Sequence, residues 1–415
     1  MITIIDLFSG AGGLTEGFRN ENYELIAHVE MDSQACKTLQ ARDAFYYLKS
    51  NNQLEIYKKY LNNEITLSEF LNLVPKSVTD KVINLAISEE NLSQIFSEID
   101  VKRSDKKING IIGGPPCQAY STIGRAQNER IKHRDTRIYL YQYYTLFLKQ
   151  YEPDFFIFEN VKGLLSFKDL DGTNLLPKIK KAFENSLPKS GYHIDYKIVN
   201  SADYGVPQKR ERLIIFGYKK DYSRVNFFES LKKYEETPPT INQLFKDLPI
   251  LESGQTLNIY NESKPAKYVD NHIRNFELPL TQNIARKNNS NDLEIYKIVA
   301  KEKLKKNNVR YPDLPSKLIK HKNANIFLDR FKAIDGTSVC HTVVAHISKD
   351  GHYYIHPDFK QNRSITVREA ARIQTFPDDF YFENSRTAAF RQIGNAVPPY
   401  LSKALSQTII DVLYK

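Results

Sequence analysis

The amino-terminal segment constrains the fold most, because a short apolar run leads directly into a glycine-rich turn. The run is mostly β-branched, as is typical of a buried strand, and consists of Ile2, Ile4, Ile5, Leu7 and Phe8. Gly10, Gly12 and Gly13 then allow a tight turn into a helix that begins near Leu14. A strand, a glycine-rich turn and a helix form a cradle for a nucleotide-like cofactor. The spacing matches neither Gly-x-Gly-x-x-Gly nor a phosphate-binding P-loop.

A second apolar run, residues 25–29, predicts the next strand and is followed by Glu30. Glu30 stands about 20 residues beyond the first glycine, where such cradles place a carboxylate that binds ribose hydroxyls. Strand-like and helix-like segments alternate up to Tyr218. This alternation predicts an α/β fold with a doubly wound, mostly parallel sheet.

A cysteine on a stiff loop is the first candidate for chemistry. Residues 113–121 read Gly-Gly-Pro-Pro-Cys-Gln-Ala-Tyr-Ser and directly follow an apolar stretch. Pro115 and Pro116 fix backbone torsions before Cys117, so the loop presents the cysteine at the edge of the predicted sheet. A cysteine is more often a small buried hydrophobe than a nucleophile, and the loop alone does not decide between the two.

A carboxylate is expected at the same edge. Residues 155–158 predict a buried strand, and Glu159 stands just beyond its carboxyl end. Open α/β sheets place their chemistry at that edge. A glutamate in this position is usually a solvated loop residue, so its catalytic interpretation depends on a partner such as Cys117.

Composition narrows the class of protein. The chain has 415 residues and a net charge of +10, which suits a polyanionic partner, although such charge often only aids solubility. Its three cysteines, Cys36, Cys117 and Cys340, are far apart, which argues against disulfides and a cysteine-rich zinc site and fits a reducing cytosol. We expect no metal. No apolar stretch reaches the roughly 18 residues of a membrane span, and no signal peptide is recognisable.

The pattern predicts three parts of the chain. Residues 1–236 form a cofactor-binding domain with a helical insertion at about 45–95, and residues 237–362 lose the α/β rhythm. Residues 363–415 return to the first domain, with a capping box of Thr366 and Glu369 that opens a helix over 367–374. The irregular part carries a basic cluster that is either a solvated face or a phosphate contact: Lys301, Lys303, Lys305, Lys306 and Arg310.

With these segments in view, the chain resembles the C5-cytosine DNA methyltransferase family over about the first 40 residues, 105–218 and 340–400. The matching blocks fall in the family's order: residues 6–14 with Glu30, 115–118, 159–161, 208–212, 363–380 and 392–399. The resemblance implies that 237–362 is the variable target-recognition domain. The long polar stretch 121–136 directly follows the predicted nucleophile loop, which favours a lid that closes over DNA; the alternative is an ordinary surface loop.

The resemblance implies S-adenosyl-L-methionine as the cofactor. The residues expected to bind it are Phe8, Ser9, Gly10, Gly12, Gly13, Leu14, Glu30, Met31, Pro115 and Asn395. The family usually carries an aspartate that contacts the adenine amino group, but the candidate stretch, residues 82–88, has none. A backbone group, Asn84 or Ser88 is left to take its place.

The resemblance also implies the chemistry. The Cys117 thiolate attacks C6 of cytosine, which makes C5 nucleophilic, while Glu159 acts at N3 and Arg212 stabilises charge near O2. Arg210 and Gln118 complete the expected catalytic set. Because C5 and C6 are stacked inside a duplex, the target base must be flipped out of it.

The sequence therefore predicts a sequence-specific DNA (cytosine-5)-methyltransferase that acts on double-stranded DNA. We expect a monomer in the bacterial cytoplasm, protecting DNA in a restriction–modification system beside an endonuclease that shares its site without a stable complex. One alternative is an RNA (tRNA) cytosine-5 methyltransferase, but the size of 237–362 favours DNA. The other is a non-catalytic DNA-binding relative, against which Cys117, Glu159 and Arg212 argue.

Overall fold

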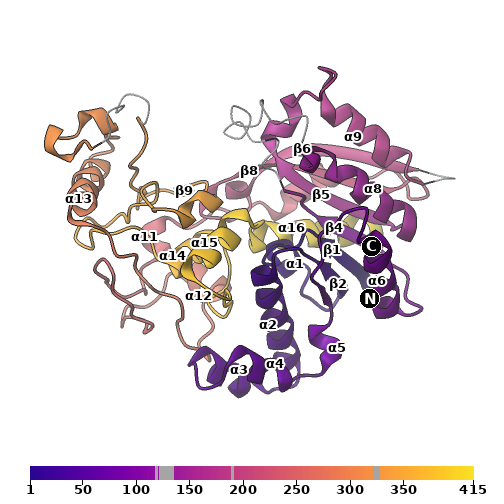
Figure 1. Cartoon of the computed structure of the whole chain (residues 1–415), viewed down its shortest axis with the longest axis horizontal. Coiled ribbons are helices and arrows are strands. Elements are labelled where there is room, and N and C mark those ends of the chain that lie inside the picture. The colour runs from indigo at the N-terminus through magenta and orange to yellow at the C-terminus, as the bar shows by residue number, and fades with distance from the viewer. Residues whose placement is uncertain (117–119, 121–134, 188–190, 321–327) are drawn as a thin grey trace.

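The computed structural model describes residues 1–116, 120, 135–187, 191–320 and 328–415, and its centre is a seven-stranded sheet (Figure 1). The strands run in the order β3-β2-β1-β4-β5-β8-β6. Their bounds are β1 (Ile2–Leu7), β2 (Tyr23–Val29), β3 (Val82–Ile83), β4 (Gly110–Gly113), β5 (Phe155–Val161), β6 (Tyr192–Asn200) and β8 (Glu211–Lys219). Neighbours are parallel except at β8, which is antiparallel to β5 and β6. This confirms the mostly parallel α/β sheet that the sequence predicts.

Helices cover both faces of the sheet, because successive strand residues point to opposite sides. In β5, Phe156 and Phe158 join one apolar cluster, whereas Phe155 and Ile157 join another. The first cluster is completed by α6 (Leu92–Arg103), α8 (Leu140–Tyr151) and α9 (Leu175–Glu184). The second is completed by α1 (Gly13–Glu16), α10 (Phe227–Leu231) and α16 (Pro399–Ile409). Burial on both faces explains why the strands read as continuous apolar runs.

A helical arm extends from the amino-terminal half of the sheet (Figure 1). It consists of α2 (Ser33–Ser50), α3 (Leu54–Leu61), α4 (Leu67–Asn72) and α5 (Lys76–Thr79). The apolar cluster of α2, α3 and α4 also contains Leu278. Arg42 Nη1 lies 2.8 Å from Asp379 Oδ1, and the Tyr57 hydroxyl donates to the Asp379 carbonyl at 2.7 Å. The arm thus connects the first domain to distant segments, whereas β3 and α6 of the 45–95 range belong to the sheet layer.

The segment 237–362 is irregular, as expected, with short helices joined by loops. Its helices are α11 (Ile241–Leu244), α12 (Lys267–His272) and α13 (Ser290–Leu304), and α13 lies at the end of the molecule opposite α8 and α9 (Figure 1). A small parallel sheet pairs β7 (Gln208–Lys209) with β9 (Cys340–His341). This pairing joins the segment to the chain just before β8.

The carboxy-terminal part divides between two cores. The helices α14 (Val367–Ile373) and α15 (Arg386–Asn395) share an apolar cluster with residues of 241–365, whereas α16 packs on the sheet. The domain bounds expected from the sequence stay predictions, but this packing ties residues 365–396 closely to the irregular segment. In the described ranges, no helix combines the length and the hydropathy that crossing a membrane requires.

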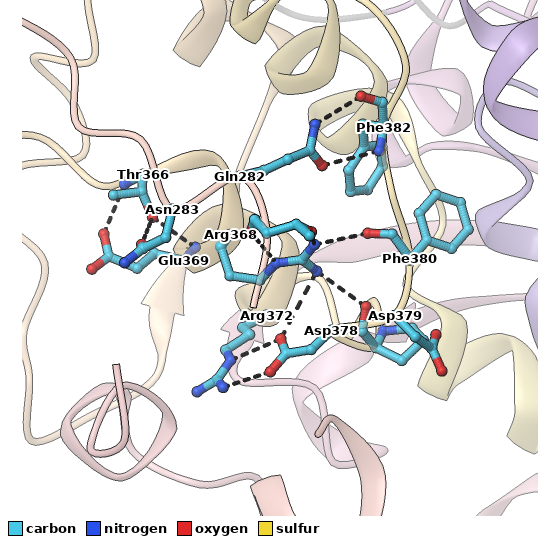
Figure 2. Close-up of polar contacts among 12 residues, drawn as sticks. Gln282, Asn283, Thr366, Arg368, Glu369, Arg372, Asp378, Asp379, Phe380 and Phe382 are labelled. Carbon is cyan, nitrogen blue, oxygen red and sulfur yellow. Dashed lines mark hydrogen bonds and ion pairs between the residues drawn. The ribbon is translucent and has the colours of Figure 1, made fainter. Parts of the chain in front are cut away.

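A buried polar network holds α14 against the irregular segment (Figure 2). Arg372 lies 2.6 Å from carboxylate oxygens of both Asp247 and Asp378, and all three side chains are buried. Arg368 donates to the carbonyl of Thr281 at 3.1 Å. The predicted capping box of Thr366 and Glu369 is confirmed at the start of α14. One acceptor of Arg372, Asp247, belongs to the irregular segment, and the other, Asp378, belongs to the carboxy-terminal part. The network therefore fixes the position of α14 relative to the irregular segment.

Candidate active site

Three candidate segments meet at one edge of the sheet, where β1, β4 and β5 end. Strand pairing places Leu7 beside Gly113, and Gly113 beside Phe158. The glycine-rich turn follows Leu7, the proline-rich loop follows Gly113 and Glu159 follows Phe158. The fold therefore brings the predicted cofactor turn, nucleophile loop and acid together, although more than 100 residues separate the first from the last.

The glycine-rich turn needs glycine for two reasons. Gly10 (φ 53°) and Gly12 (φ 79°) have left-handed backbones, which residues with a Cβ rarely adopt. A Cβ on Gly13 would collide with the carbonyl of Val397, so the turn packs directly on the segment after α15. Ser9 is buried, and its hydroxyl donates to the Asp6 carbonyl at 2.8 Å. The helix after the turn, α1, is a single turn long.

Phe8 and Leu14 flank this turn in different ways. Phe8 is half-buried against the apolar cluster of the sheet and has a φ of 57°, an uncommon conformation for a residue with a side chain. Such strain is typical of functional loops. Leu14 instead buries its side chain in the core beneath the sheet. Only Phe8 therefore offers a side chain to a ligand at this turn.

Glu30, which the sequence predicts as the ribose-binding carboxylate, turns back onto the glycine-rich turn. Its Oε2 accepts from the Gly10 amide at 2.8 Å, and its Oε1 accepts from the Asp32 amide at 2.7 Å. Burial raises the pKa of Glu30 despite these bonds. The side chain of the neighbouring Met31 is 66% exposed. Each Glu30 oxygen keeps a second lone pair, so the carboxylate can still accept from ribose hydroxyls.

Asn84 stands after β3, where the family's aspartate is missing. Its side-chain amide donates to the carbonyls of Glu30 at 3.0 Å and of Met31 at 3.1 Å. Asn84 thus holds the backbone beside the predicted ribose site, a contact that the sequence did not foretell. Ser88, the other candidate, is half-buried.

Glu159 and Arg212 form an ion pair at the sheet edge. Arg212 Nε lies 3.0 Å from Glu159 Oε1, and each side chain is 12% exposed. The expectation that Glu159 follows its strand was wrong, because β5 continues to Val161 by pairing with β8, where Val161 stands opposite Arg212. Both charged groups therefore project from paired strands, which fixes their backbones more firmly than a loop would.

Of the nucleophile loop, Gly114, Pro115 and Pro116 are described, and Pro115 is buried. Cys117, Gln118 and residues 121–134 of the expected lid lie outside the described residues. The other two cysteines are free, buried thiols. Burial, together with Glu30 and Asp32, raises the pKa of Cys36 to about 12, and burial raises the pKa of Cys340. Neither thiol is suited to act as a thiolate, so Cys117 stays the candidate.

Arg210 lies apart from the Glu159–Arg212 pair. Its guanidinium is buried and donates to the carbonyls of Val343 at 2.8 Å and Gly394 at 3.3 Å. These contacts join the residue between β7 and β8 to the irregular segment and to α15, and the expected catalytic role of Arg210 stays a prediction. Gln208, which the sequence did not single out, also accepts from the Val343 amide at 2.9 Å.

Asn395 ends α15 with an exposed side chain. Before it, Gly394 packs so closely on Ala345 that a Cβ would collide with the Ala345 backbone. Val397, two residues after Asn395, touches the glycine-rich turn at Gly13. Asn395 therefore lies in a segment that meets both the cofactor turn and the irregular part. Among the residues that the structure describes, no cluster of His, Cys, Asp and Glu side chains is suited to hold a metal ion.

The comparisons with known proteins agree with this geometry. A family model described as C-5 cytosine-specific DNA methylase matches residues 2–68 and 84–411, so the gap spans the end of the helical arm and β3. The type II methyltransferase M.Bpa9945I of Bacillus paralicheniformis is 37% identical, over 99% of each chain. M.DdeI of Desulfomicrobium norvegicum is 28% identical, over 98% of this chain and 88% of that protein.

Solved structures support the fold. A protein encoded within an E. coli prophage and described as a DNA modification methyltransferase superposes with a TM-score of 0.60 over the full length of both chains, at 23% identity. The Dnmt2 methyltransferase of S. pombe superposes with a TM-score of 0.52 over 99% of each chain, at 13% identity.

Proposed function

The chain belongs to the C-5 cytosine-specific DNA methylase family, and we propose that the edge carrying Glu159 and Arg212 performs the methylation of cytosine at C5. The protein is a DNA (cytosine-5)-methyltransferase of the type found in restriction–modification systems. The observation that carries the residue assignment is the ion pair of Glu159 and Arg212 beside the stem of the loop that bears Cys117.

The proposed cofactor is S-adenosyl-L-methionine, which supplies the methyl group when bound. The residues at the cofactor turn fit it: Glu30 has lone pairs for the ribose hydroxyls, and Phe8 has a half-buried ring for the adenine. A Cβ on Gly10 would meet nothing within 4 Å, so the turn leaves room there for the methionine portion. Asn84, which donates to the Glu30 carbonyl, and Asn395, two residues before the contact of Val397 with Gly13, are the further polar residues proposed to complete the site.

The chemistry follows from the two charged groups and the thiolate. Attack of the Cys117 sulfur on C6 pushes electrons toward N3 and O2, and a proton on Glu159 passes to N3. Arg212 already donates to Glu159 and, through Nη1, to the Glu211 carbonyl at 2.8 Å. Its guanidinium has five N–H donors, so donors remain for the negative charge that develops at O2. C5, now nucleophilic, would take the methyl group that the bound cofactor supplies. Loss of the C5 proton then lets the sulfur leave, and the proton on N3 returns to Glu159, which restores the aromatic ring with its new methyl group.

We further propose that residues 237–362 select the target sequence and that the lid segment 121–136 encloses the flipped base. The net charge of +10 favours binding to duplex DNA. The working unit is proposed to be a monomer in the bacterial cytoplasm. A cognate endonuclease would cut the same site without forming a stable complex with it.

Replacing Cys117 with alanine tests the assignment. We expect Cys117→Ala to abolish transfer of a labelled methyl group to duplex DNA, while cofactor and DNA binding persist. The wild type should form a covalent adduct with DNA containing 5-fluorocytosine, because fluorine blocks the final proton loss, and the variant should not. Cys36→Ala, which removes a buried thiol, should still form the adduct.

Two outcomes would contradict the proposal. Normal turnover by Cys117→Ala would remove Cys117 from the mechanism. Methyl transfer by the wild type to tRNA, with none to duplex DNA, would favour the RNA alternative instead.

A further inference from the structure

Asn160, the residue after Glu159, is completely buried and uses both ends of its amide. Its Nδ2 donates to the carbonyl of Pro115 at 3.3 Å, and its Oδ1 accepts from the amide of Val161 at 2.8 Å. The first bond leads to the stem of the nucleophile loop and the second returns to its own strand. Because an amide has one donor end and one acceptor end, this pairing also fixes which way the group points.

Glu159 contacts the same stem one residue earlier. An ideal Cβ on Gly114 would lie 2.7 Å from Glu159 Oε2 and 3.3 Å from the Glu159 carbonyl, so the carboxylate approaches the loop as closely as it does only because residue 114 is glycine. Two successive residues of β5, Glu159 and Asn160, therefore hold two successive residues of the loop, Gly114 and Pro115. Backbone pairing of β4 with β5 stops at Gly113 and Phe158, so these contacts continue the register beyond the sheet.

The proposed reaction needs such a connection. The Cys117 sulfur and the Glu159 carboxyl act on two atoms of the same ring, so their separation must match the base. Misplacement of a reacting group by about 1 Å costs about 10²-fold in rate. Cys117 follows Pro115 by only two residues, and the proline at 116 limits the freedom of the intervening backbone. An anchor at Pro115 is therefore close enough to control where the loop presents the cysteine.

We propose that Asn160 is a positioning residue that, together with the space left by Gly114, holds the stem of the nucleophile loop against Glu159 and sets the geometry in which Cys117 and Glu159 share one base. This inference rests on the proposed roles of Cys117 and Glu159. It goes beyond those roles in assigning the alignment of Cys117 to β5, the strand that carries Glu159.

Asn160→Asp tests the contact with little change in volume. One carboxylate oxygen still accepts from the Val161 amide, but the other now faces the Pro115 carbonyl and repels it. We expect the rate of adduct formation with 5-fluorocytosine DNA, and the kcat for methyl transfer, to fall about 10²-fold. KM values for the cofactor and for DNA should stay within about twofold. Circular dichroism and thermal unfolding would establish that the variant is folded.

Asn91→Asp is the matched control, because Asn91 also donates its amide to a carbonyl, that of Ala86 at 2.9 Å, in the same domain. It should leave kcat and adduct formation unchanged. Gly114→Ala tests the neighbouring contact, that of Gly114 with Glu159, and should also lower kcat, since its methyl group pushes the Glu159 carboxylate and the loop stem apart.

The outcomes separate the inference from the proposed function. Wild-type adduct rates in folded Asn160→Asp and Gly114→Ala would overturn the positioning role while leaving Cys117 as the nucleophile. If Asn160→Asp does not fold, Gly114→Ala decides. If instead Cys117→Ala keeps its turnover, the proposed function fails first, whatever the two positioning variants do.

Discussion

The ion pair of Arg212 with Glu159 and the cluster around Arg372 use the same two chemical groups in opposite surroundings. Arg212 makes one carboxylate contact, and both partners are 12% exposed at the edge of the sheet. Arg372 is fully buried and lies 2.6 Å from each of two carboxylates, those of Asp247 and Asp378, while it also donates to the Leu244 carbonyl at 2.8 Å. The two arginines thus differ both in their burial and in the number of their carboxylate partners.

The difference indicates what each arginine can do. The donors of Arg372 are taken up by fixed acceptors within the protein, so the group can only hold α14 in place. Burial acts to raise the pKa of Asp378, but Arg372, together with Arg368 and Tyr260, lowers it, so the carboxylate stays charged. Arg212 retains donors and a route to solvent, so a substrate can use it. An arginine–carboxylate pair therefore stabilises the fold where all the arginine donors have acceptors in the protein, and it can take part in a reaction where some donors are left for a substrate.

Arg372→Met should give the largest effect. It leaves two buried carboxylates without their cation, which costs about 3–5 kcal/mol of unfolding free energy. Urea unfolding followed by circular dichroism measures this loss. At a temperature where the variant is still folded, kcat should change little, because Arg372 does not touch the proposed site.

The control is an exposed pair, Lys232 with Glu229, which lies 2.7 Å apart on one helical turn. Lys232→Met should leave the free energy of unfolding nearly unchanged, because exposed ion pairs contribute little to stability. Equal losses in the two variants would mean that burial does not distinguish these ion pairs, and the comparison would fail.

Glu159→Gln, in contrast to Arg372→Met, should lower the rate of methyl transfer strongly and the stability only slightly. The amide keeps the shape but cannot donate a proton to N3 as a carboxylic acid does, so single-turnover methyl transfer should fall about 10²-fold. Unfolding free energy should change by about 1 kcal/mol or less, because the pair is partly solvated. A large loss of stability with unchanged chemistry would place Glu159 among the structural residues, beside Asp378.

Local patterns made part of this arrangement predictable. The β1 strand, the glycine-rich turn, Glu30 and the capping box of Thr366 and Glu369 all depend on residues close together in sequence, and each was found where the sequence predicts it. The meeting of the glycine-rich turn with Glu159 followed from the rule that parallel strands share an edge.

Long-range contacts could not be predicted in the same way. The apolar run ends at Phe158, but β5 continues to Val161 because β8, some 50 residues later, pairs with it. The buried acceptors of Arg210 lie on Val343 and Gly394, more than 130 residues away. Nothing in the local sequence indicates that the amide of Asn160 bonds to Pro115. The sequence suggested a partner across this edge only for Glu159.

Acid should lower the stability of the protein through His356, which is buried beside Glu369. Burial, and then the nearby Arg363, lowers the pKa of His356 to about 4, although Glu369 lies 3.5 Å away and favours the charged form. An unfolded histidine has a pKa of about 6.5. Between these values the unfolded chain binds a proton that the folded chain does not, so stability falls as the pH drops from about 6.5 to about 4. The slope from this residue reaches about 1.4 kcal/mol per pH unit.

Urea unfolding across that pH range measures the slope. His356→Gln should remove the contribution of His356 to the slope of unfolding free energy against pH. His346→Gln, at an exposed position, should leave that slope unchanged. Below pH 4.5 a second loss with the same sign is expected from Glu369, whose pKa Arg363 lowers to about 2 against the effect of burial. An unchanged slope in His356→Gln would mean that the histidine is not held neutral by its surroundings.

We expect the smallest effect on stability from replacing the exposed lysines at the end of α13, whose ion pairs, unlike that of Arg372, lie in water. Lys305 lies 2.6 Å from Glu302, Lys306 lies 2.8 Å from Asp335, and Lys303 donates to Asn308 at 2.9 Å. Two of the three already have carboxylate partners, and exposed pairs of this kind contribute little to stability. We expect their replacement by glutamine to leave unfolding unchanged.

Their effect on DNA binding should be equally modest and independent of sequence. Each lysine that neutralises a phosphate contributes about 0.9 to the slope of log K against log salt. Because local carboxylates hold Lys305 and Lys306, the triple variant should lower the slope by about 1, from Lys303, and weaken cognate and unrelated duplexes alike. Lys106→Gln is the control, since Lys106 pairs with Glu24 at 2.5 Å before the amino end of β4, away from the proposed site. A loss of slope near 3 would show instead that all three lysines bind phosphates and that Lys305 and Lys306 exchange their carboxylate partners to do so. An exposed ion pair, unlike the one around Arg372, would then be free to serve a ligand.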